Sequence, residues 1–506
     1  IKGYVEGIMD GVADTPEKMD RYIKTIYNKA NDMDRLINEL TIYSKIDNNR
    51  ILYNFQRINI SDYFSDCVEE VGLDLESKNI KLNFDNLVPD DTIVIADPEQ
   101  MKRVINNIIG NSVKYMDKDP SKGQGMIEIR LLDDVDSIRI EIEDNGRGIA
   151  AKDLGVDTLE FKEAHMVKQG DATSTSGKYH FPVPLPAMID EVNNACGLRA
   201  KHKEYAKPQT GRYRKGIGFS MHFHGAGFTG SGERDIIKAV ARLHKYKDGT
   251  VEILASNGEI GQGLRTTFPK IVAHELNIPL EKVFYDHPDT SRVPDSGPTV
   301  ASRSLMTVGE LLRRAAIKLR TEWEEGKDQI VEERFVEPDF MIPFYLDKFR
   351  GDAYPTYAWG AQAIEVEVDT YTGITKILGA YASFDVGTPM DYNIVMGQME
   401  GGFLQGIGYA STEFMNYDNK GRIRNNSFSD YLIPTAVDVP VLNCQLHVEE
   451  YPFGPYGAKG AGELPLVGAA PAYVEAIEQA LGGDFRLHHA PFTAEDTIKI
   501  LVKEEA

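Results

Sequence analysis

Cysteine is scarce in this sequence of 506 residues, which contains three, at Cys67, Cys196 and Cys444. They lie far apart, and no CxxC pair occurs. The sequence therefore excludes a disulfide framework, a structural zinc knuckle and a four-cysteine iron–sulfur cluster within this chain. We expect a reducing, cytoplasmic compartment from this cysteine usage.

Long apolar runs are absent too, since no stretch reaches the roughly 18 uninterrupted apolar residues that a membrane span requires. We also expect no secretory signal. The formal net charge of −22, from 56 Lys and Arg against 78 Asp and Glu, disfavours a nucleic-acid partner, because a phosphate backbone would be repelled over most of the surface. We expect a soluble, acidic protein with several folding units.

Glycine, proline and histidine are distributed unevenly. Of the 45 glycines and 24 prolines, 9 and 4 precede residue 150, and residues 1–150 contain no histidine. Because Gly and Pro mark turns, the first part is expected to be rich in helices and the rest dense in turns. The shift predicts a change of domain type near residue 150 in an α+β multidomain chain.

Two helices are predicted in the first part. Thr15-Pro16-Glu17 supplies a cap, a proline and an acid, and apolar residues follow at three- and four-residue spacing up to Ile46. This stripe suits a helical bundle or a dimer seam, with a core helix of a monomer as the alternative. Asp97-Pro98-Glu99 begins the second helix, and strands are expected at about 126–131 and 137–143. We expect the second helix to turn inward Val104, Ile105, Ile108 and Ile109.

Three polar residues share one face of that second helix. Asn107, Asn111 and Lys114 fall at i, i+4 and i+7. Amide oxygens suit a magnesium ion, and lysine suits phosphate. The spacing therefore permits a nucleotide site, although such a face is more often simply solvated.

The segment DNGRGI, with Asp144, Gly146 and Gly148, ends a predicted strand. A carboxylate there can accept from an adenine amino group, and the glycines let the backbone approach a ligand. This segment resembles the first glycine box of sensor histidine kinases, and residues 107–115 (NIIGNSVKY) resemble their N box. By this resemblance Asn107, Gly146 and Gly148 would belong to an ATP site.

The resemblance to sensor histidine kinases also divides the first part of the chain. Residues 1–55 would be partial dimerisation helices in a helical hairpin, and residues 56–150 a partial ATPase α/β sandwich. Asn111 would hold magnesium, Lys114 would contact phosphate and Asp144 would read adenine. The family's phosphoacceptor histidine motif, lid and second glycine box do not occur in this sequence. We therefore expect weak ATP binding and no autophosphorylation.

Residues 151–506 predict a second α+β region. Strands are expected at Val251–Leu254 and Ile364–Val368, and a helix at about Ser304–Trp323. Four glycine-rich loops are also expected, at residues 258–263, 294–304, 397–408 and 457–465. Their exposed backbone amides suit a polar, anionic cofactor, although each alone reads as an ordinary turn.

Glu463 is the candidate general base. It lies between Gly462 and Leu464-Pro465, after small residues, so a ligand can come close. We expect its carboxylate to be poorly solvated, which suits a base. A surface glutamate in a loop is the alternative.

His222 and His224 are candidate metal ligands, because they lie two apart on a predicted strand and face the same side. No third ligand at a fixed spacing is visible. We therefore favour the alternative that both histidines are structural.

The segments of the second part, in this order and at these separations, strongly resemble the molybdenum-binding subunit of the xanthine dehydrogenase and aldehyde oxidase family. Asp385-Val386-Gly387 and residues 430–435 match the same pattern. The resemblance implies an oxidoreductase that hydroxylates an electron-poor carbon of a heterocycle or aldehyde, with Glu463 as the general base. It implies molybdopterin contacts from Ile260, Gly261, Gln262, Ala301, Ser302, Arg303, Ser304 and Gln398. Iron–sulfur and FAD groups would lie on partner chains.

Both resemblances are partial. The large domain that completes the cofactor cradle in the hydroxylase family has no counterpart here, so we expect no stoichiometric molybdenum in the purified chain. A hydroxylase fragment and a two-component kinase fragment are the two functional hypotheses, and we favour the first because its match is longer and includes a base. A third hypothesis is that two reading frames were joined artificially near residues 150–153, leaving neither role active.

Overall fold

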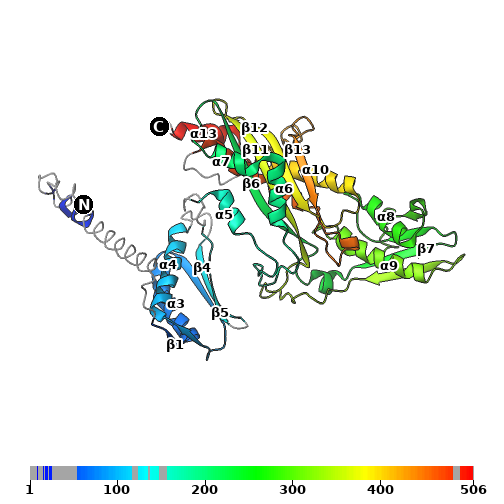
Figure 1. Cartoon of the computed structure of the whole chain (residues 1–506), viewed down its shortest axis with the longest axis horizontal. Coiled ribbons are helices and arrows are strands. Elements are labelled where there is room, and N and C mark those ends of the chain that lie inside the picture. The colour runs from blue at the N-terminus through cyan, green and yellow to red at the C-terminus, as the bar shows by residue number, and fades with distance from the viewer. Residues whose placement is uncertain are drawn as a thin grey trace. The chain divides into compact units, whose positions relative to one another are not determined.

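The computed structural model describes residues 54–116, 124–134, 137–146, 156–482 and 490–504, together with residues 8, 15, 18–20 and 22–25. The chain divides into two compact units, Ile1–Gly155 and Val156–Ala506 (Figure 1). Most of the helix expected between residues 15 and 46, and with it the dimerisation-helix interpretation, lies outside the described residues.

Within the described residues of 54–146, unit 1 combines two helices with a three-stranded and a two-stranded sheet. Its elements are β1 (Gln56–Asn59), α3 (Ile60–Ser77), β2 (Ile80–Leu87), β3 (Ile93–Ala96), α4 (Pro98–Tyr115), β4 (Gly125–Asp134) and β5 (Ser137–Asp144). β4 pairs with β2 in parallel and with β5 antiparallel, and β1 pairs with β3 antiparallel. Asp97 caps α4 by accepting from the N–H groups of Glu99 and Gln100, as the sequence predicts. Apolar side chains of α3 and α4 pack against β4 in one core, and Figure 1 shows both helices beside β4.

The inward face of α4 is narrower than predicted. Ile105 and Ile109 are 4% and 3% exposed, whereas Val104 and Ile108 are 57% and 40% exposed. The expectation was wrong for Val104 and Ile108, because they lie on the flank of the helix and not on the side that meets the sheet. They line a cavity of about 620 Å³ together with Phe55.

Unit 2 contains two four-stranded sheets. The first has the order β13-β12-β11-β6 and the second the order β10-β7-β8-β9. The strands of the first are β6 (Tyr213–Ala226), β11 (Thr356–Asp369), β12 (Thr375–Asp385) and β13 (Leu442–His447). Those of the second are β7 (Val240–Lys245), β8 (Val251–Leu254), β9 (Val283–Phe284) and β10 (Gln329–Arg334). β11 is antiparallel to both neighbours, and β12 runs parallel to β13.

Helices cover both sheets of unit 2. They are α5 (Thr158–Ala164), α6 (Leu185–Cys196), α7 (Leu198–Tyr205), α8 (Leu264–Leu276), α9 (Gly309–Thr321), α10 (Tyr392–Ser411), α11 (Leu464–Val467), α12 (Ala469–Leu481) and α13 (Ala494–Glu504). Short turns of helix are η3 (Gly232–Ile237), η4 (Leu280–Lys282), η5 (Ser304–Val308) and η6 (Pro455–Gly457). α10 and α12 share a core with β11 and β12, α6 packs on the opposite face of β11, and α8 and α9 cover the second sheet. Of the helices that the structure describes, none combines the length and the apolar character that a membrane span requires.

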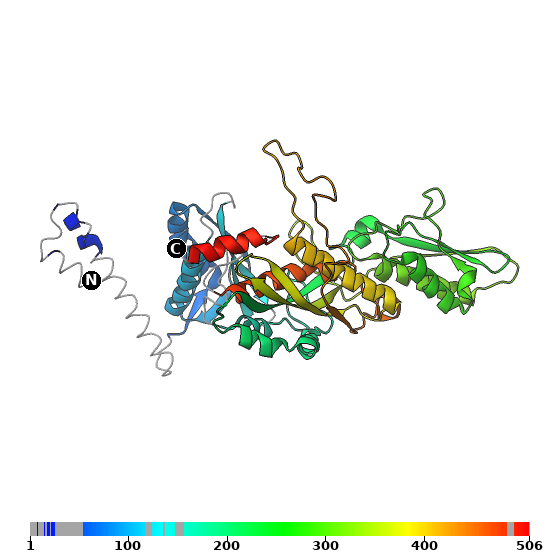
Figure 2. The same ribbon diagram turned by 90° about the horizontal axis from the view of Figure 1, so that it is seen from above.

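Residues 397–408 correct the prediction of a glycine-rich loop, because they form part of α10. A Cβ at Gly402 would lie 2.4 Å from Pro465 Cγ, and one at Gly406 would lie 2.6 Å from Ala469 Cβ. These glycines therefore let α10 come close to α11 and α12. The connection from α10 to β13 is irregular and extends away from the sheet (Figure 2).

Candidate functional site

Glycine-rich segments of unit 2 meet around a cavity of about 370 Å³, here named the glutamate cavity. Of the predicted cofactor-binding and catalytic residues, Ile260, Gln262, Ala301, Ser302, Arg303, Ser304, Gln398 and Glu463 line it. Gly261 is not among the lining residues. It has a φ of +106°, and its N–H donates to Glu259 Oε1 over 2.8 Å. Segments far apart in the sequence thus converge on one site.

Glu463 is fixed through one of its two carboxylate oxygens. The Ser302 hydroxyl donates to Glu463 Oε2 (2.6 Å) and accepts from the Glu463 N–H (3.1 Å). His224 Nε2 lies 3.5 Å from the same oxygen, and 52% of the Glu463 side chain is exposed. The expected poor solvation is therefore wrong within unit 2, because the cavity is open here. Oε1 has no partner among the described residues and is available to a ligand.

The loop that carries Ser302 has an unusual backbone. Ala301 and Ser302 have left-handed φ values of +54° and +51°, which cost a non-glycine residue about 1 kcal/mol or more each. The Ala301 carbonyl accepts from the Gly227 N–H (3.1 Å). A Cβ at Gly460 would lie 1.7 Å from the Ser302 carbonyl oxygen, so only glycine permits this approach. Strained backbone where two loops touch is typical of functional sites.

Three successive backbone N–H groups at the cavity lack acceptors. Those of Gly460, Ala461 and Gly462 have no hydrogen-bond partner in the described part of the chain, and all three residues line the glutamate cavity. Consecutive unpaired N–H groups attract anions and carbonyl oxygens. This donor set fits an anionic cofactor rich in hydrogen-bonding groups, as molybdopterin is.

The two predicted glutamines differ in what they offer. Gln262 folds back on its own loop, because its Oε1 accepts from the Ile260 N–H (2.6 Å) and its Nε2 donates to the Gly258 carbonyl (2.9 Å). The side chain of Gln398, on α10, has no hydrogen-bond partner within the described residues and lines the cavity. Gln262 therefore shapes the loop, whereas Gln398 is free to bind a ligand.

Arg303 directs its charge into the protein. Its side chain is 0% exposed, and its guanidinium donates to both carboxylate oxygens of Glu233 and to the Pro298 carbonyl. The charge of Arg303 is therefore neutralised by a protein carboxylate. Its contribution to a ligand in the glutamate cavity is limited to its backbone and aliphatic stem.

A buried ion pair beside the cavity escaped the sequence analysis. Lys459, a lining residue, donates to Asp385 Oδ2 over 2.6 Å, and both side chains are 0% exposed. Burial raises the pKa of Asp385, although Lys459 acts in the opposite direction. The pair ties the loop of residues 458–463 to the end of β12. The only signal in the sequence is a charged residue among small ones in AKGAGE.

His222 and His224 lie on β6, as predicted, and the structural role that we favour for them stays a prediction. Both ring nitrogens of His222 are buried without a hydrogen-bond partner. Burial lowers the pKa of His222 to about 4. Among the described residues, no group of three or more His, Cys, Asp and Glu side chains is arranged to hold a metal ion.

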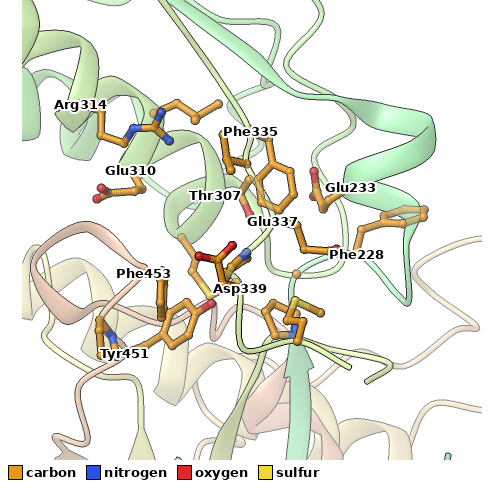
Figure 3. Close-up of a pocket in the computed structure, with 18 of the residues that line it drawn as sticks. Phe228, Glu233, Thr307, Glu310, Arg314, Phe335, Glu337, Asp339, Tyr451 and Phe453 are labelled. Carbon is orange, nitrogen blue, oxygen red and sulfur yellow. The ribbon is translucent and has the colours of Figure 1, made fainter. Parts of the chain in front are cut away.

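A second cavity of unit 2, of about 400 Å³, shares no lining residue with the glutamate cavity and is here named the aromatic cavity. Phe228, Phe335, Tyr451 and Phe453 surround it, together with Glu310, Arg314 and Asp339 (Figure 3). No sequence motif predicted any of these residues as part of a site.

In unit 1 the residues predicted to bind ATP are exposed. Asn107, Asn111 and Lys114 share a solvent-facing side of α4, as their spacing predicts. Asp144, at the end of β5, is also exposed and accepts from the Gly146 N–H over 2.9 Å. Gly148 lies outside the described residues.

Comparison with protein families supports both resemblances. Residues 191–340 and 331–440 match the family model of the molybdopterin cofactor-binding domain. Residues 96–180 match that of the histidine kinase-, DNA gyrase B- and HSP90-like ATPases. Both family resemblances and the α+β multidomain fold class are confirmed.

Known proteins of the molybdenum hydroxylase type are similar to this chain over part of their length. The carbon monoxide dehydrogenase large chain of Afipia carboxidovorans is 28% identical over 349 residues, which are 60% of this chain and 42% of that protein. Aldehyde oxidase 4 of Cavia porcellus is 32% identical over 251 residues, 45% of this chain and 18% of that protein. The solved aldehyde oxidoreductase of Desulfovibrio gigas matches with a TM-score of 0.60 at 25% identity, covering 70% of this chain and 39% of that one. The chain thus spans less than half the length of these relatives.

Proposed function

We propose that unit 2 is the C-terminal, molybdopterin-binding part of a molybdenum hydroxylase subunit, with Glu463 as the general base. The reaction class is hydroxylation of an electron-poor carbon in a heterocycle or an aldehyde. The observation that carries this proposal is that Glu463 lines the glutamate cavity with its carboxylate held at Oε2 by Ser302, while Oε1 has no partner among the described residues. A base fixed in one orientation is what proton abstraction requires.

The residues of the glutamate cavity fit the cofactor by their chemistry. The unpaired N–H groups of Gly460, Ala461 and Gly462 offer donors to pterin or phosphate oxygens, and Gln398 offers an amide. Ser304 and the backbone of residues 301–303 complete the lining. Ile260, Gly261 and Gln262 shape the neighbouring loop. When bound, the molybdenum cofactor would accept the two electrons removed from the substrate carbon.

We also propose that this chain works together with partner chains. Iron–sulfur and FAD groups would reside on other chains of a hydroxylase complex, because electrons must leave the cofactor and this chain has three scattered cysteines. The connection between α10 and β13 exposes large apolar side chains, including Phe428 at 83% and Val437 at 94%. Such a surface suits contact with the rest of a larger assembly. We place this assembly in the cytoplasm, where unpaired thiols persist.

ATP binding with magnesium, as in a kinase fragment of a two-component phosphorelay, is the second candidate function. The observation in its favour is the shared exposed face of Asn107, Asn111 and Lys114 on α4. Asn111 would hold the magnesium ion, and Asp144 with Gly146 would meet the adenine.

Thermal unfolding in the presence of added molybdopterin tests the proposal for unit 2. Both tryptophans, Trp323 and Trp359, lie in unit 2, so their fluorescence reports its unfolding. A ligand present at about 100 times its Kd stabilises the folded state by about 2.7 kcal/mol. We expect a higher Tm for the natural chain and for Glu463→Gln, which removes the base but keeps the cradle.

Two glycine variants provide the contrast. Gly460→Ala should abolish the rise in Tm, because its Cβ would lie 1.7 Å from the Ser302 carbonyl oxygen. Gly401→Ala should keep the rise in Tm, because no atom lies within 4 Å of a Cβ at this position on α10. Absence of any shift in the natural chain at saturating cofactor would refute the proposal. In loaded protein, Glu463→Gln should slow aldehyde oxidation by about 100-fold or more.

A further inference from the structure

The aromatic cavity has the size and the walls of a small-molecule site. Its volume of about 400 Å³ falls within the range of ligand pockets. The rings of Phe228, Phe335, Tyr451 and Phe453 surround it (Figure 3). The Tyr451 and Phe453 ring centroids lie 5.7 Å apart. Aromatic faces favour a flat apolar ligand and attract a cation.

The charged side chains that line this cavity are paired, with one exception. The pairs are Glu233 with Arg303 (3.0 Å), Glu310 with Arg313 (2.7 Å), Glu337 with Arg234 (2.8 Å) and Arg314 with Glu333 (2.6 Å). Asp339 lines the cavity and makes no hydrogen bond or ion pair with any described residue. Asp339 is therefore the lining carboxylate with no cation beside it among the described residues, and Arg234 is shared by Glu337 and Asp235. The negative charge of the lining favours a cationic ligand.

Two largely buried residues, Tyr451 and Thr307, bring unpartnered hydroxyl groups to the cavity. Tyr451 is 2% exposed and Thr307 is 8% exposed. Neither side-chain oxygen has a hydrogen-bond partner among the described residues, and both residues line the cavity. Figure 3 shows the Tyr451 hydroxyl directed toward the interior of the cavity. Neither oxygen is fully buried, so a ligand that bonds to one of them replaces water there, a net gain of about 0.5–1.5 kcal/mol.

From the aromatic walls, the unpaired carboxylate of Asp339 and the two unpartnered hydroxyls, we propose that the aromatic cavity binds an organic monocation with an aromatic ring system, of the aryl-alkyl ammonium class. The ring packs among the aromatic side chains, and the ammonium group faces Asp339. The hydroxyls of Tyr451 and Thr307 bond to polar groups of the ligand. The two cavities share no lining residue, although the buried pair of Glu233 and Arg303 joins their walls. The binding proposed here does not rest on the function proposed for Glu463.

Calorimetric titration of the full chain with two matched probes tests this site. Tryptamine carries an indole ring and an ammonium group, and tryptophol carries the same ring with a neutral hydroxyl. We expect tryptamine to bind about tenfold more tightly, the sum of a cation–π contact and an exposed ion pair. Asp339→Asn should weaken tryptamine by about threefold or more and leave tryptophol unchanged.

Control variants separate the site from general effects of charge and folding. Asp347→Asn removes an exposed carboxylate that does not line the cavity and should change neither affinity. Tyr451→Phe removes only the hydroxyl and should weaken both probes by a few fold. Equal affinities of the two probes, no binding at millimolar concentration, or an unchanged tryptamine affinity in folded Asp339→Asn would each overturn the proposal.

Discussion

Two properties of Ser302 have opposite effects on the free energy of unfolding of unit 2. Its hydroxyl makes two hydrogen bonds to Glu463, while its φ of +51° strains the backbone. Ser302→Ala loses both bonds and keeps the strain, whereas Ser302→Gly loses both bonds and relieves it. We predict that the free energy of unfolding of Ser302→Ala is about 1 kcal/mol lower than that of Ser302→Gly. Denaturant unfolding followed by tryptophan fluorescence measures the difference.

The neighbouring residue gives the matched control. Ala301 has a φ of +54° but no side-chain hydrogen bond to lose. Ala301→Gly should therefore stabilise unit 2 by up to about 1 kcal/mol. A loss of stability in Ala301→Gly would contradict the strain that we assign to this loop.

His222 makes the stability of unit 2 depend on pH. Burial lowers its pKa from 6.5 to about 4, so the unfolded chain binds more protons between these two values. Stability from this residue is fully present above pH 6.5 and is lost as the pH falls toward 4. From pH 7 to pH 5 we predict a loss of about 2 kcal/mol. His222→Leu should remove this part of the pH dependence in denaturant unfolding.

A neutral neighbour tests whether the effect is specific. Met221 precedes His222 on β6, and Met221→Leu, which removes no titratable group, should leave the pH dependence of unfolding unchanged. A natural chain and a His222→Leu variant with the same slope between pH 7 and pH 5 would argue against a buried, neutral His222.

Among the elements, α12 lies very close to β6 because β6 contains two glycines. A Cβ at Gly216 would lie 1.9 Å from the Ala476 carbonyl oxygen, and one at Gly218 would lie 2.0 Å from that of Ala472. Since these contacts are with backbone, the helix itself must shift to admit a methyl group. We predict that Gly218→Ala destabilises unit 2 by about 2–3 kcal/mol in denaturant unfolding.

Gly401 on α10 is the control for Gly218, because nothing lies within 4 Å of its Cβ position. Gly401→Ala should stabilise the helix by up to about 1 kcal/mol. If both variants changed stability equally, close approach of α12 to β6 would not be the cause.

The elements also show where sequence reasoning succeeds. Caps and alternation are local signals, and they predicted the start of α4 at Asp97-Pro98 and the strands β4, β5 and β8. The prediction of a loop at residues 397–408 was wrong because glycine has two uses, to make a turn and to let two elements approach each other closely. In α10 the second use applies, and the partner residues Pro465 and Ala469 are distant in the sequence. The predicted burial of Val104 and Ile108 was wrong because apolar character does not reveal which side of a helix is covered by the rest of the protein.

At the scale of the whole molecule, the sequence predicts those residues of the candidate site that lie in glycine-rich segments. It does not predict the contacts between residues that are far apart in the sequence. Ser302 and Glu463 were singled out separately, but their hydrogen bonds join residues 161 positions apart. The same holds for Asp385 with Lys459 and for Arg303 with Glu233, whose buried pairing no local pattern reveals. Composition predicts a change of domain type near residue 150, which stays a prediction, and the described chain divides into two compact units between Gly155 and Val156. The ATPase family match, at residues 96–180, crosses that division.

The hypothesis that two reading frames were joined artificially remains a prediction about the gene. Amplification of the source DNA across codons 140–165 should fail to give a product of the expected length if the two parts are separate. A faithful product of that length would count against the artificial junction.

ATP binding is the last prediction at the scale of the whole molecule. A Kd of 1 μM requires about 8 kcal/mol, whereas exposed polar contacts contribute about 0.5–1.5 kcal/mol each. Asn111, Lys114 and Asp144 are exposed in unit 1, so together they fall well short of that sum. We predict that calorimetry with ATP and magnesium detects no submicromolar binding. Asn111→Ala should abolish any weaker binding, and Asn106→Ala, an exposed residue of the same helix, should retain it. Submicromolar affinity that depends on Asn111 would instead establish a complete nucleotide site in unit 1.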